Sequence, residues 1–314
     1  LATLGSVGTE KLAADVLKGK QFFYDARDTR LARDGYMSCA ACHNDGGHDG
    51  RTWDFTGRGE GLRNTIRLRG RAGGQGPLHW SGNFDETQDF EGQIRTLAQG
   101  TGLMADAQFN TGTRSAPLGD TKAGASADLD ALAAYMASLN TFEPSPWRNN
   151  GALTSAALTG QGVFNAQCAS CHGGTAFTNS TAGLLKNVGT LQPSSGKRLD
   201  GVLAGIDIPT LRDAWLTAPY LHNGSAATLD DAVRAHTTLA LSAADVASVS
   251  AFVQQAGSEA TGVAVGRYVK FEALGEYTGQ AWSSMAEFNL LGTNGAVLGR
   301  TGWTATADSA ELVG

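Results

Sequence analysis

The sequence has few of the features that mark membrane-spanning or nucleic-acid-binding proteins. Charged residues make up only 17% of the 314 residues and the formal net charge is −6. We therefore expect no basic surface for nucleic acid or for an anionic membrane. No apolar run approaches the roughly 18 residues that a membrane-spanning helix needs. No glycine-rich phosphate loop follows a predicted strand, and no nucleophile triad is evident from residue spacing.

A secretory leader is also missing from the start of the sequence. The chain begins at Leu1 without a basic-then-apolar segment, so we expect any signal peptide to have been removed or to lie upstream. A length of 314 residues is sufficient for two domains, each with its own core. The 42 glycines favour long loops between the structured elements.

The chain has only four cysteines, and all of them fall in two nearly identical pentapeptides. Residues 39–43 read CAACH and residues 168–172 read CASCH. Two cysteines spaced i and i+3 lie on one face of a helical turn, where their sulfurs can bond the two vinyl groups of one porphyrin. The histidine that follows can then coordinate the iron, and C-x-x-C-H is the attachment signature of haem c. A zinc site or a redox dithiol is the alternative, but a four-cysteine zinc site would leave both histidines beside it by accident.

We therefore predict a dihaem protein with two covalently bound haem c groups. No disulfide is expected, because haem attachment would use every cysteine in the chain. Covalent haem c is attached outside the bacterial cytoplasm, so the sequence predicts a periplasmic, cell-surface or secreted protein. The predicted attachment residues and proximal iron ligands are Cys39, Cys42 and His43 for the first haem, and Cys168, Cys171 and His172 for the second.

The segment before each haem motif is repeated as well. Residues 17–23 read LKGKQFF and residues 158–164 read LTGQGVF. Each half is predicted to close with an amphipathic helix, one capped by Ser126 and one by a capping box that begins at Ser242. This plan predicts a mainly α protein with two tandem class-I cytochrome c-like haem domains and long loops.

We expect three segments along the chain. Residues 1–145 are predicted to form the first cytochrome c-like domain, with a peroxide-reactive haem, and residues 146–258 the second, with an electron-transfer haem. A linker rich in proline and turn formers lies where they join. Residues 259–314 alternate as short strands and resemble part of a discoidin-type β-sandwich, so the chain is expected to be cut from a longer protein.

Further segments carry a resemblance to a known family. Arg63-Asn64 follows the first haem motif, residues 79–82 read HWSG, and residues 211–224 read LRDAWLTAPYLHNG. Over about residues 10–257 the chain resembles the bacterial dihaem cytochrome c peroxidases. It is also similar to their relative, the dihaem enzyme that oxidises tryptophans in pre-methylamine dehydrogenase.

The resemblance implies roles for several residues at the junction of the two domains. In the family, the first-domain haem reacts with hydrogen peroxide, the second stores or relays electrons, and a tryptophan that matches Trp80 lies between them. The alternative for Trp80 is a core aromatic. The resemblance also implies a calcium ion held by Asn64 and by the carbonyls of Thr217 and Pro219, and such all-oxygen ligation suits a hard cation. Otherwise Asn64 caps a turn.

The resemblance also implies different sixth ligands for the two haems. Where the family has a methionine, this chain has His236, so we predict that His172 and His236 form a bis-histidine second haem. The alternative is a structural His236. The family's distal histidine falls near Thr56, and the loop over residues 53–62 contains no histidine. The first haem is therefore predicted to be five-coordinate or water-bound, and open to peroxide.

Proton transfer at the first haem poses a problem. Cleavage of the peroxide O–O bond needs a distal base. The family's glutamine matches Gln93, but Leu103 stands where a glutamate is expected ten residues later. We consider Glu91 and His79 as substitutes for the missing base. The alternatives are a helix salt bridge from Glu91 to Arg95 and a structural hydrogen-bonding role for His79.

The leading hypothesis is a peroxide-using dihaem oxidoreductase. Its electrons would come from a small redox protein or from a protein side chain. The competing hypothesis is a dihaem electron-transfer cytochrome without peroxidase turnover, which the lost glutamate favours and in which both irons would be six-coordinate. The residues with predicted catalytic roles are Trp80, Gln93, Glu91 and His79.

Overall fold

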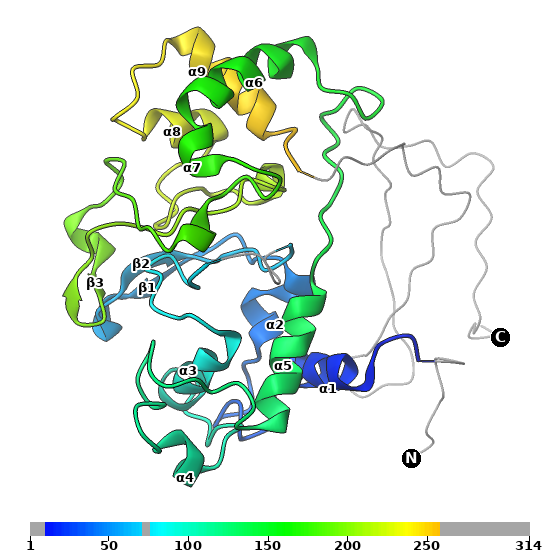
Figure 1. The fold of residues 1–314 in the computed structure, drawn as a ribbon, viewed down its shortest axis with the longest axis vertical. Coiled ribbons are helices and arrows are strands. Elements are labelled where there is room, and N and C mark those ends of the chain that lie inside the picture. Colours follow the sequence, from blue (N-terminus) through cyan, green and yellow to red (C-terminus); the bar gives the residue numbers. More distant parts are fainter. Residues whose placement is uncertain (1–9, 71–75, 258–314) are drawn as a thin grey trace, which may run out of the picture. The chain divides into compact units, whose positions relative to one another are not determined.

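The computed structural model describes residues 10–70 and 76–257, so the predicted β tail at residues 259–314 lies outside the described residues. Helices dominate this part, joined by long loops and two short antiparallel sheets (Figure 1), which confirms the prediction of a mainly α protein. The α-helices are α1 (Ala14–Tyr24), α2 (Cys39–Cys42), α3 (Phe90–Thr96), α4 (Asp106–Phe109), α5 (Ala127–Ser138), α6 (Ser155–Gln167), α7 (Ala169–His172), α8 (Leu229–Arg234) and α9 (Ala243–Val253). The strands are β1 (Thr52–Phe55), β2 (Gly61–Asn64), β3 (Lys197–Arg198) and β4 (Gly201–Val202). The 3-10 helices are η1 (Asn44–Gly46), η2 (Thr56–Arg58), η3 (Thr87–Asp89), η4 (Ser180–Ala182), η5 (Pro193–Ser195) and η6 (Ala214–Leu216).

The first half is built around the packing of α1 against α5. Ser126 is the N-cap of α5, as predicted, and its hydroxyl accepts the Leu129 N–H. Phe23 of α1 and Tyr135 of α5 meet edge to face, with ring centroids 5.1 Å apart. Cys39 packs against this core, which places the first C-x-x-C-H motif beside it.

The second half repeats the arrangement with α6 against α9. Ser242 and Asp245 form the predicted capping box at the start of α9. Phe164 of α6 and Phe252 of α9 pack with ring centroids 5.0 Å apart, and Cys168 lies against the same core. Figure 1 shows α6 and α9 together near the top of the view and α1 and α5 together near the bottom. Each haem motif is therefore attached to its own pair of helices.

A β-hairpin contacts the second half where the two halves meet. Strands β1 and β2 pair antiparallel from Thr52↔Asn64 to Phe55↔Gly61, within the stretch that the sequence indicated to be a loop. Asn64 donates its N–H to the carbonyl of His222 over 2.7 Å. Arg63 donates from Nη1 to the carbonyl of Ser195 over 2.9 Å. These bonds hold β2 against the second half.

The segment that joins the halves is fastened to the end of α9. The Ser145 hydroxyl donates to the Gln254 carbonyl over 2.7 Å, and Arg148 Nε donates to the Gln255 carbonyl over 2.9 Å. None of the helices in the described ranges combines the length and apolarity needed to cross a membrane.

Candidate functional site

The first C-x-x-C-H motif forms the short helix α2, with His43 directly after it. Cys39 and Cys42 are half-buried free thiols at the two ends of the helix, and His43 donates its N–H to the Cys39 carbonyl over 3.0 Å. His43 Nδ1 lies 3.4 Å from the Gly47 carbonyl oxygen. Burial lowers the pKa of His43 to about 4, so the imidazole is neutral at pH 7.

The second motif has the same local arrangement. Cys168 is the N-cap of α7, and Cys171 lies within it. His172 Nδ1 lies 3.3 Å from the Phe177 carbonyl oxygen. Burial lowers the pKa of His172 to about 4, and the nearby His236 lowers it further. Both motif histidines are therefore neutral and directed by a backbone carbonyl at Nδ1.

These residues fit covalent haem. A neutral imidazole whose Nδ1 faces a backbone carbonyl has Nε2 left for a metal, which is the usual arrangement of a histidine ligand. All four cysteines, Cys39, Cys42, Cys168 and Cys171, are free thiols in the described part of the chain. Within the same part, no group of three or more His, Cys, Asp or Glu side chains is arranged to hold a bare metal ion. The donor sets thus suit two porphyrins better than a zinc ion.

His236 lies two residues after the end of α8, in the electrostatic neighbourhood of His172. Its Nδ1 is 2.9 Å from the Ala232 carbonyl oxygen, which leaves Nε2 as its other ring nitrogen. Its charge is among the causes that lower the pKa of His172. His172 and His236 therefore share one electrostatic neighbourhood, and ligation by His236 stays a prediction.

The structure also brings His79 and Gln93 together in the first half. His79 Nε2 lies 3.4 Å from Gln93 Nε2 on α3, and its Nδ1 lies 2.7 Å from Asn83 Oδ1. The charge of His79 influences the pKa of His43, which places the two rings in one electrostatic neighbourhood. Burial lowers the pKa of His79 itself, although Glu60 acts against this.

Aromatic rings surround His79. Its ring centroid is 4.3 Å from that of Phe84 and 5.0 Å from that of Phe90, and these two phenylalanines meet edge to face. Such apolar neighbours displace water, which is the physical origin of the low pKa. His79 is therefore a neutral imidazole with one edge on Asn83 and the other on Gln93.

Glu91 is fully buried and already has partners on both oxygens. Oε1 accepts from Arg95 Nε over 2.8 Å and from the Met104 N–H over 3.1 Å. Oε2 accepts the Leu103 N–H over 2.9 Å. The geometry favours the alternative of a salt bridge to Arg95, and Glu91 holds the very segment in which the family's glutamate was expected.

Trp80 lies between β2 and the second half. Its indole Nε1 donates to the Asn64 carbonyl over 2.8 Å, and its own carbonyl accepts the Asp207 N–H over 2.8 Å. The tryptophan is thus bonded to both halves of the molecule.

The three predicted calcium ligands are close together. Asn64 Nδ2 donates to the Pro219 carbonyl over 2.5 Å and to the Leu221 carbonyl over 3.3 Å. The buried Oδ1 of Asn64 has no partner among the described residues. A cavity of about 60 Å³ is lined by Asn64 and Thr217 and also by three arginines, Arg67, Arg69 and Arg212.

Thr56, the position matched to the family's distal histidine, is exposed in η2 at the tip of the β1–β2 hairpin. It lies between the strands and donates its N–H to Asp54 Oδ1 over 2.8 Å. The absence of a distal ligand at this position stays a prediction.

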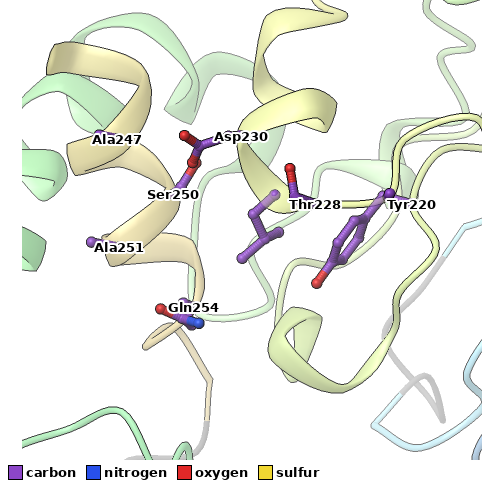
Figure 2. Close-up of a pocket in the computed structure, with 9 residues that line it drawn as sticks. Tyr220, Thr228, Asp230, Ala247, Ser250, Ala251 and Gln254 are labelled. Atoms are coloured by element: carbon purple, nitrogen blue, oxygen red, sulfur yellow. The ribbon is translucent and has the colours of Figure 1, made fainter. Parts of the chain in front are cut away.

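A second cavity, of about 360 Å³, lies between α8 and α9 (Figure 2). None of the residues predicted from the sequence to act in catalysis or haem binding lines it; its lining residues include Tyr220, Thr228, Asp230, Ser250 and Gln254. The chemistry predicted from the sequence is therefore not located in this cavity.

Sequence reasoning missed the polar residues that support the site. Asn83 binds the ring of His79, and Ser195 Oγ lies 2.7 Å from the Nε2 of His222, which is 1% exposed. Burial lowers the pKa of His222 to about 4 and the charge of Arg63 adds to this effect. The spacing of four residues from His79 to Asn83 is the one local signal that could have indicated the first pair.

Comparison with known proteins identifies homologues of the chain. It is 28% identical over 261 residues to cytochrome c peroxidase Ccp of Escherichia coli, covering 72% of this chain and 54% of the relative, so it spans about half of that protein's length. It is 28% identical over 252 residues to cytochrome c551 peroxidase of Nitrosomonas europaea, covering 68% of this chain and 70% of the relative. It is 26% identical over 260 residues to hydrazine synthase subunit gamma of Kuenenia stuttgartiensis, covering 70% of this chain and 69% of the relative. No family model matches the sequence.

Solved structures with a similar fold include a diheme peroxidase. Hydrazine synthase of Kuenenia stuttgartiensis matches with a TM-score of 0.57 at 21% identity, over 81% of this chain and 98% of that one. A MauG-like protein associated with microbial copper homeostasis matches with a TM-score of 0.54 at 20% identity, over 79% and 91%. The diheme peroxidase BthA of Burkholderia thailandensis, in its Y463M variant, matches with a TM-score of 0.50 at 16% identity, over 79% and 87%. Together with the two C-x-x-C-H sites, these comparisons make the chain a homologue of the bacterial cytochrome c peroxidases.

Proposed function

We propose that the chain is a dihaem c-type oxidoreductase that reduces hydrogen peroxide at its first haem site. The observation that carries the proposal is the asymmetry between the two sites. The charge of His236 acts on His172 in the second site, whereas in the first site the partly buried His79 and Gln93 lie side by side and the charge of His79 acts on His43. A second imidazole suits an electron-transfer centre, and a pair that can move a proton suits a reactive one.

The chain's own residues would handle the protons. Haem c, when bound, supplies the redox chemistry and, at the first site, an iron position for the oxidant. Reduction of one peroxide to two waters takes up two electrons and two protons. His79 Nε2 would accept a proton from one peroxide oxygen and return it to the departing oxygen, while Gln93 Nε2 donates a hydrogen bond that orients the peroxide. The electrons would come from a small redox protein or from a protein side chain.

Electron relay through Trp80 is part of the same proposal. Its indole donates to β2 and its backbone carbonyl accepts from Asp207 in the second half, so the residue connects the two sites through bonded structure. The proposal assigns residues 1–145 and 146–258 to the two haem domains and residues 259–314 to a separate tail. Because haem c is attached outside the cytoplasm, we assign the protein to the periplasm, cell surface or medium.

We also propose a calcium ion at the junction, held by Asn64 and by the Thr217 and Pro219 carbonyls. The buried Oδ1 of Asn64, which lacks a partner in the described ranges, supports it. Arg67 and the other arginines of this cavity raise the electrostatic cost of a cation there. Thermal unfolding with added calcium or with a chelator tests the site: free calcium at about 100 times Kd would stabilise the fold by about 2.7 kcal/mol. An identical melting temperature in both solutions would reject it.

Electron paramagnetic resonance of the ferric protein tests the main proposal. One high-spin signal from the first haem and one low-spin bis-histidine signal from the second are expected, and peroxide should change the optical spectrum. The His236→Met variant should lose only the bis-histidine signal. Two low-spin signals without any response to peroxide would reject the proposal.

The second candidate is an electron-transfer cytochrome without peroxidase turnover. Leu103 stands where a proton-shuttling glutamate was expected, and the nearby Glu91 has hydrogen-bond partners on both oxygens. One relative, the gamma subunit of hydrazine synthase, is not named as a peroxidase. This candidate predicts two six-coordinate irons, so the same resonance experiment separates it from the first.

A further inference from the structure

A line of side chains connects His79 to the protein surface. Glu60, whose side chain is 27% exposed, accepts a hydrogen bond at Oε1 from Asn83 Nδ2 over 3.2 Å. Asn83 is 7% exposed, and its Oδ1 lies 2.7 Å from His79 Nδ1. His79 Nε2 then lies 3.4 Å from Gln93 Nε2.

The chemistry of these groups fixes which way each of them points. A carboxylate can only accept hydrogen bonds, so Asn83 has to present its NH₂ group to Glu60. Its carbonyl oxygen is then directed at His79, and Nδ1 of that ring must carry the proton. Nε2 is left with a lone pair on the side of Gln93, whose NH₂ group can donate to it. The carboxylate of Glu60 thus sets the tautomer of His79 through one intervening residue, Asn83.

We propose that Glu60 and Asn83 are positioning residues that hold His79 in its Nδ1-protonated tautomer, so that Nε2 is the base that takes the proton from peroxide. This inference rests on the proposed function and adds to it the two residues that orient His79 to act as a base. The logic is that of a catalytic triad, in which a third group orients the base.

The backbone around His79 holds the ring in place. His79 has a φ of 65°, a left-handed conformation that a non-glycine residue keeps only where its surroundings impose it. The Leu78 N–H donates to the Phe84 carbonyl over 2.7 Å and closes the turn. From the second half, Arg198 donates to the carbonyls of Ser81 and Gly82 over 2.8 and 2.9 Å. The ring of His79 therefore has little freedom to rotate away from Asn83.

The charged groups that face His79 come from β2 and η3 and from the residues that precede β2 and follow α2. Glu60, which precedes β2, and Asp89, in η3, favour its protonated form, whereas Arg63 of β2 opposes it. His43, after α2, also shares its electrostatic neighbourhood. Lys122 forms a buried ion pair with Asp89, which reduces the effect of that carboxylate. Burial outweighs these charges, and the ring remains neutral at pH 7.

Two measurements on the haem-loaded protein test the inference. The first is the rate at which hydrogen cyanide binds the ferric first haem, because binding as cyanide requires a base to take its proton. The second is the rate of the spectral change with peroxide; both are followed against pH. His79→Phe should slow both by about 100-fold, at the low end of the range for a lost general base. Asn83→Leu keeps the base but loses the group that orients it, and should slow both by about ten-fold, less than a lost general base.

Asn83→Asp separates positioning from a merely structural role. An aspartate keeps an acceptor opposite Nδ1, so the rates should stay near the wild-type values. The carboxylate also raises the pKa of His79, so the pH at which the rates fall should move upward. Glu60→Gln, a change at a partly exposed side chain, frees the Asn83 amide to turn and should slow both reactions. Asp54→Asn removes a carboxylate from neighbouring β1 and serves as a matched control with wild-type rates.

The outcomes separate this inference from the proposed function. Wild-type rates in folded Asn83→Leu and Glu60→Gln proteins would overturn it, as would an Asn83→Asp protein as slow as Asn83→Leu. If the wild type failed to respond to peroxide, the proposed function would fall, while the cyanide rates would still decide the role of Asn83. If the Asn83→Leu protein does not fold, the rates of Glu60→Gln and Asn83→Asp still decide whether Glu60 and Asn83 position His79.

Discussion

Gly160 of α6 lies directly against the backbone carbonyl of Ser248 on α9, so close that a Cβ at this glycine would overlap the carbonyl oxygen. Gly19 of α1 has the same relationship to the Ala131 carbonyl of α5. Both glycines are the third residue of the repeated segments 17–23 and 158–164. The repeat thus marks the point where the two helices of each half approach most closely.

Adding one methyl group at this crossing should destabilise the protein. Gly160→Ala forces α6 and α9 apart, and overpacking of this kind costs about 3 kcal/mol. Gly162→Ala is the matched control on the same helix, because its Cβ meets no atom of the described residues within 4 Å. That change should leave stability equal or raise it by about 0.5 kcal/mol through helix propensity. Denaturant unfolding of the haem-loaded proteins compares them, and equal midpoints would contradict the close crossing.

Glu91 should prove to be a structural residue. Glu91→Gln removes the charge opposite Arg95. It also replaces by an NH₂ group one of the two oxygens that accept from the Leu103 and Met104 N–H groups, so we expect a loss of about 3 kcal/mol. Asp106→Asn removes the other carboxylate bound to Arg95. Because the side chain of Asp106 is 81% exposed, this change should cost less than about 1 kcal/mol. Thermal unfolding measures both. A Glu91→Gln protein of normal stability that reacts slowly with peroxide would instead support a proton-transfer role.

An ion cluster between α1 and α5 should contribute stability that disappears in acid. The hydrogen bond from Lys18 lowers the pKa of Asp128, and Arg30 lowers it further. The unfolded chain therefore binds a proton at this group more readily than the folded one, so the contribution is present above about pH 4 and is lost as pH falls below it. Because Lys18 and Arg30 are 48% and 43% exposed, solvent screening limits the effect to less than about 1 kcal/mol.

The pH dependence of urea unfolding measures this contribution. Asp128→Asn should flatten the fall in stability between about pH 4 and pH 2. Asp15→Asn, an exposed carboxylate on α1 outside the cluster, is the control and should leave the curve unchanged. Parallel curves for the wild type and Asp128→Asn would exclude a role for this cluster.

Trp80→Phe should slow communication between the two haems. Phenylalanine keeps an aromatic ring but cannot donate to the Asn64 carbonyl, and it is harder to oxidise than tryptophan. We expect the response of the second haem to peroxide to slow by at least about ten-fold, an increase in barrier of about 1.4 kcal/mol. Trp147→Phe, at a tryptophan that is 54% exposed, is the control. Stopped-flow spectra of the second haem that are identical for wild type and Trp80→Phe would eliminate the relay.

The parts of the fold that depend on local sequence were predictable. The caps at Ser126 and Ser242 are built from residues three apart, and the sequence contains everything that forms them. The β1–β2 hairpin was interpreted as a loop because its four paired residues per strand carry little periodicity. Its second strand is held by Ser195 and His222, which lie more than a hundred positions away in the chain.

In the candidate site, too, the features that depend on local sequence were predictable and those that depend on distant residues were not. The two predicted haem-binding histidines follow from a pentapeptide, whereas the hydrogen bonds around His79 depend on Asn83, on Glu60 and on the turn that brings them together. The salt bridge from Glu91 to Arg95 was open to inference at a spacing of four residues. The hydrogen bonds of Glu91 to the backbone of Leu103 and Met104 could not be predicted, because every residue type except proline offers the same main-chain donor.

Trp80 is fastened at its indole to one half of the molecule and at its backbone carbonyl to the other. Rotation of one half against the other would strain these two hydrogen bonds, so Trp80 resists such motion. In the proposed relay, the distance that an electron travels through Trp80 would therefore be set by the fold. A more viscous solvent should therefore leave that electron transfer unchanged, even where it slows the arrival of a reductant.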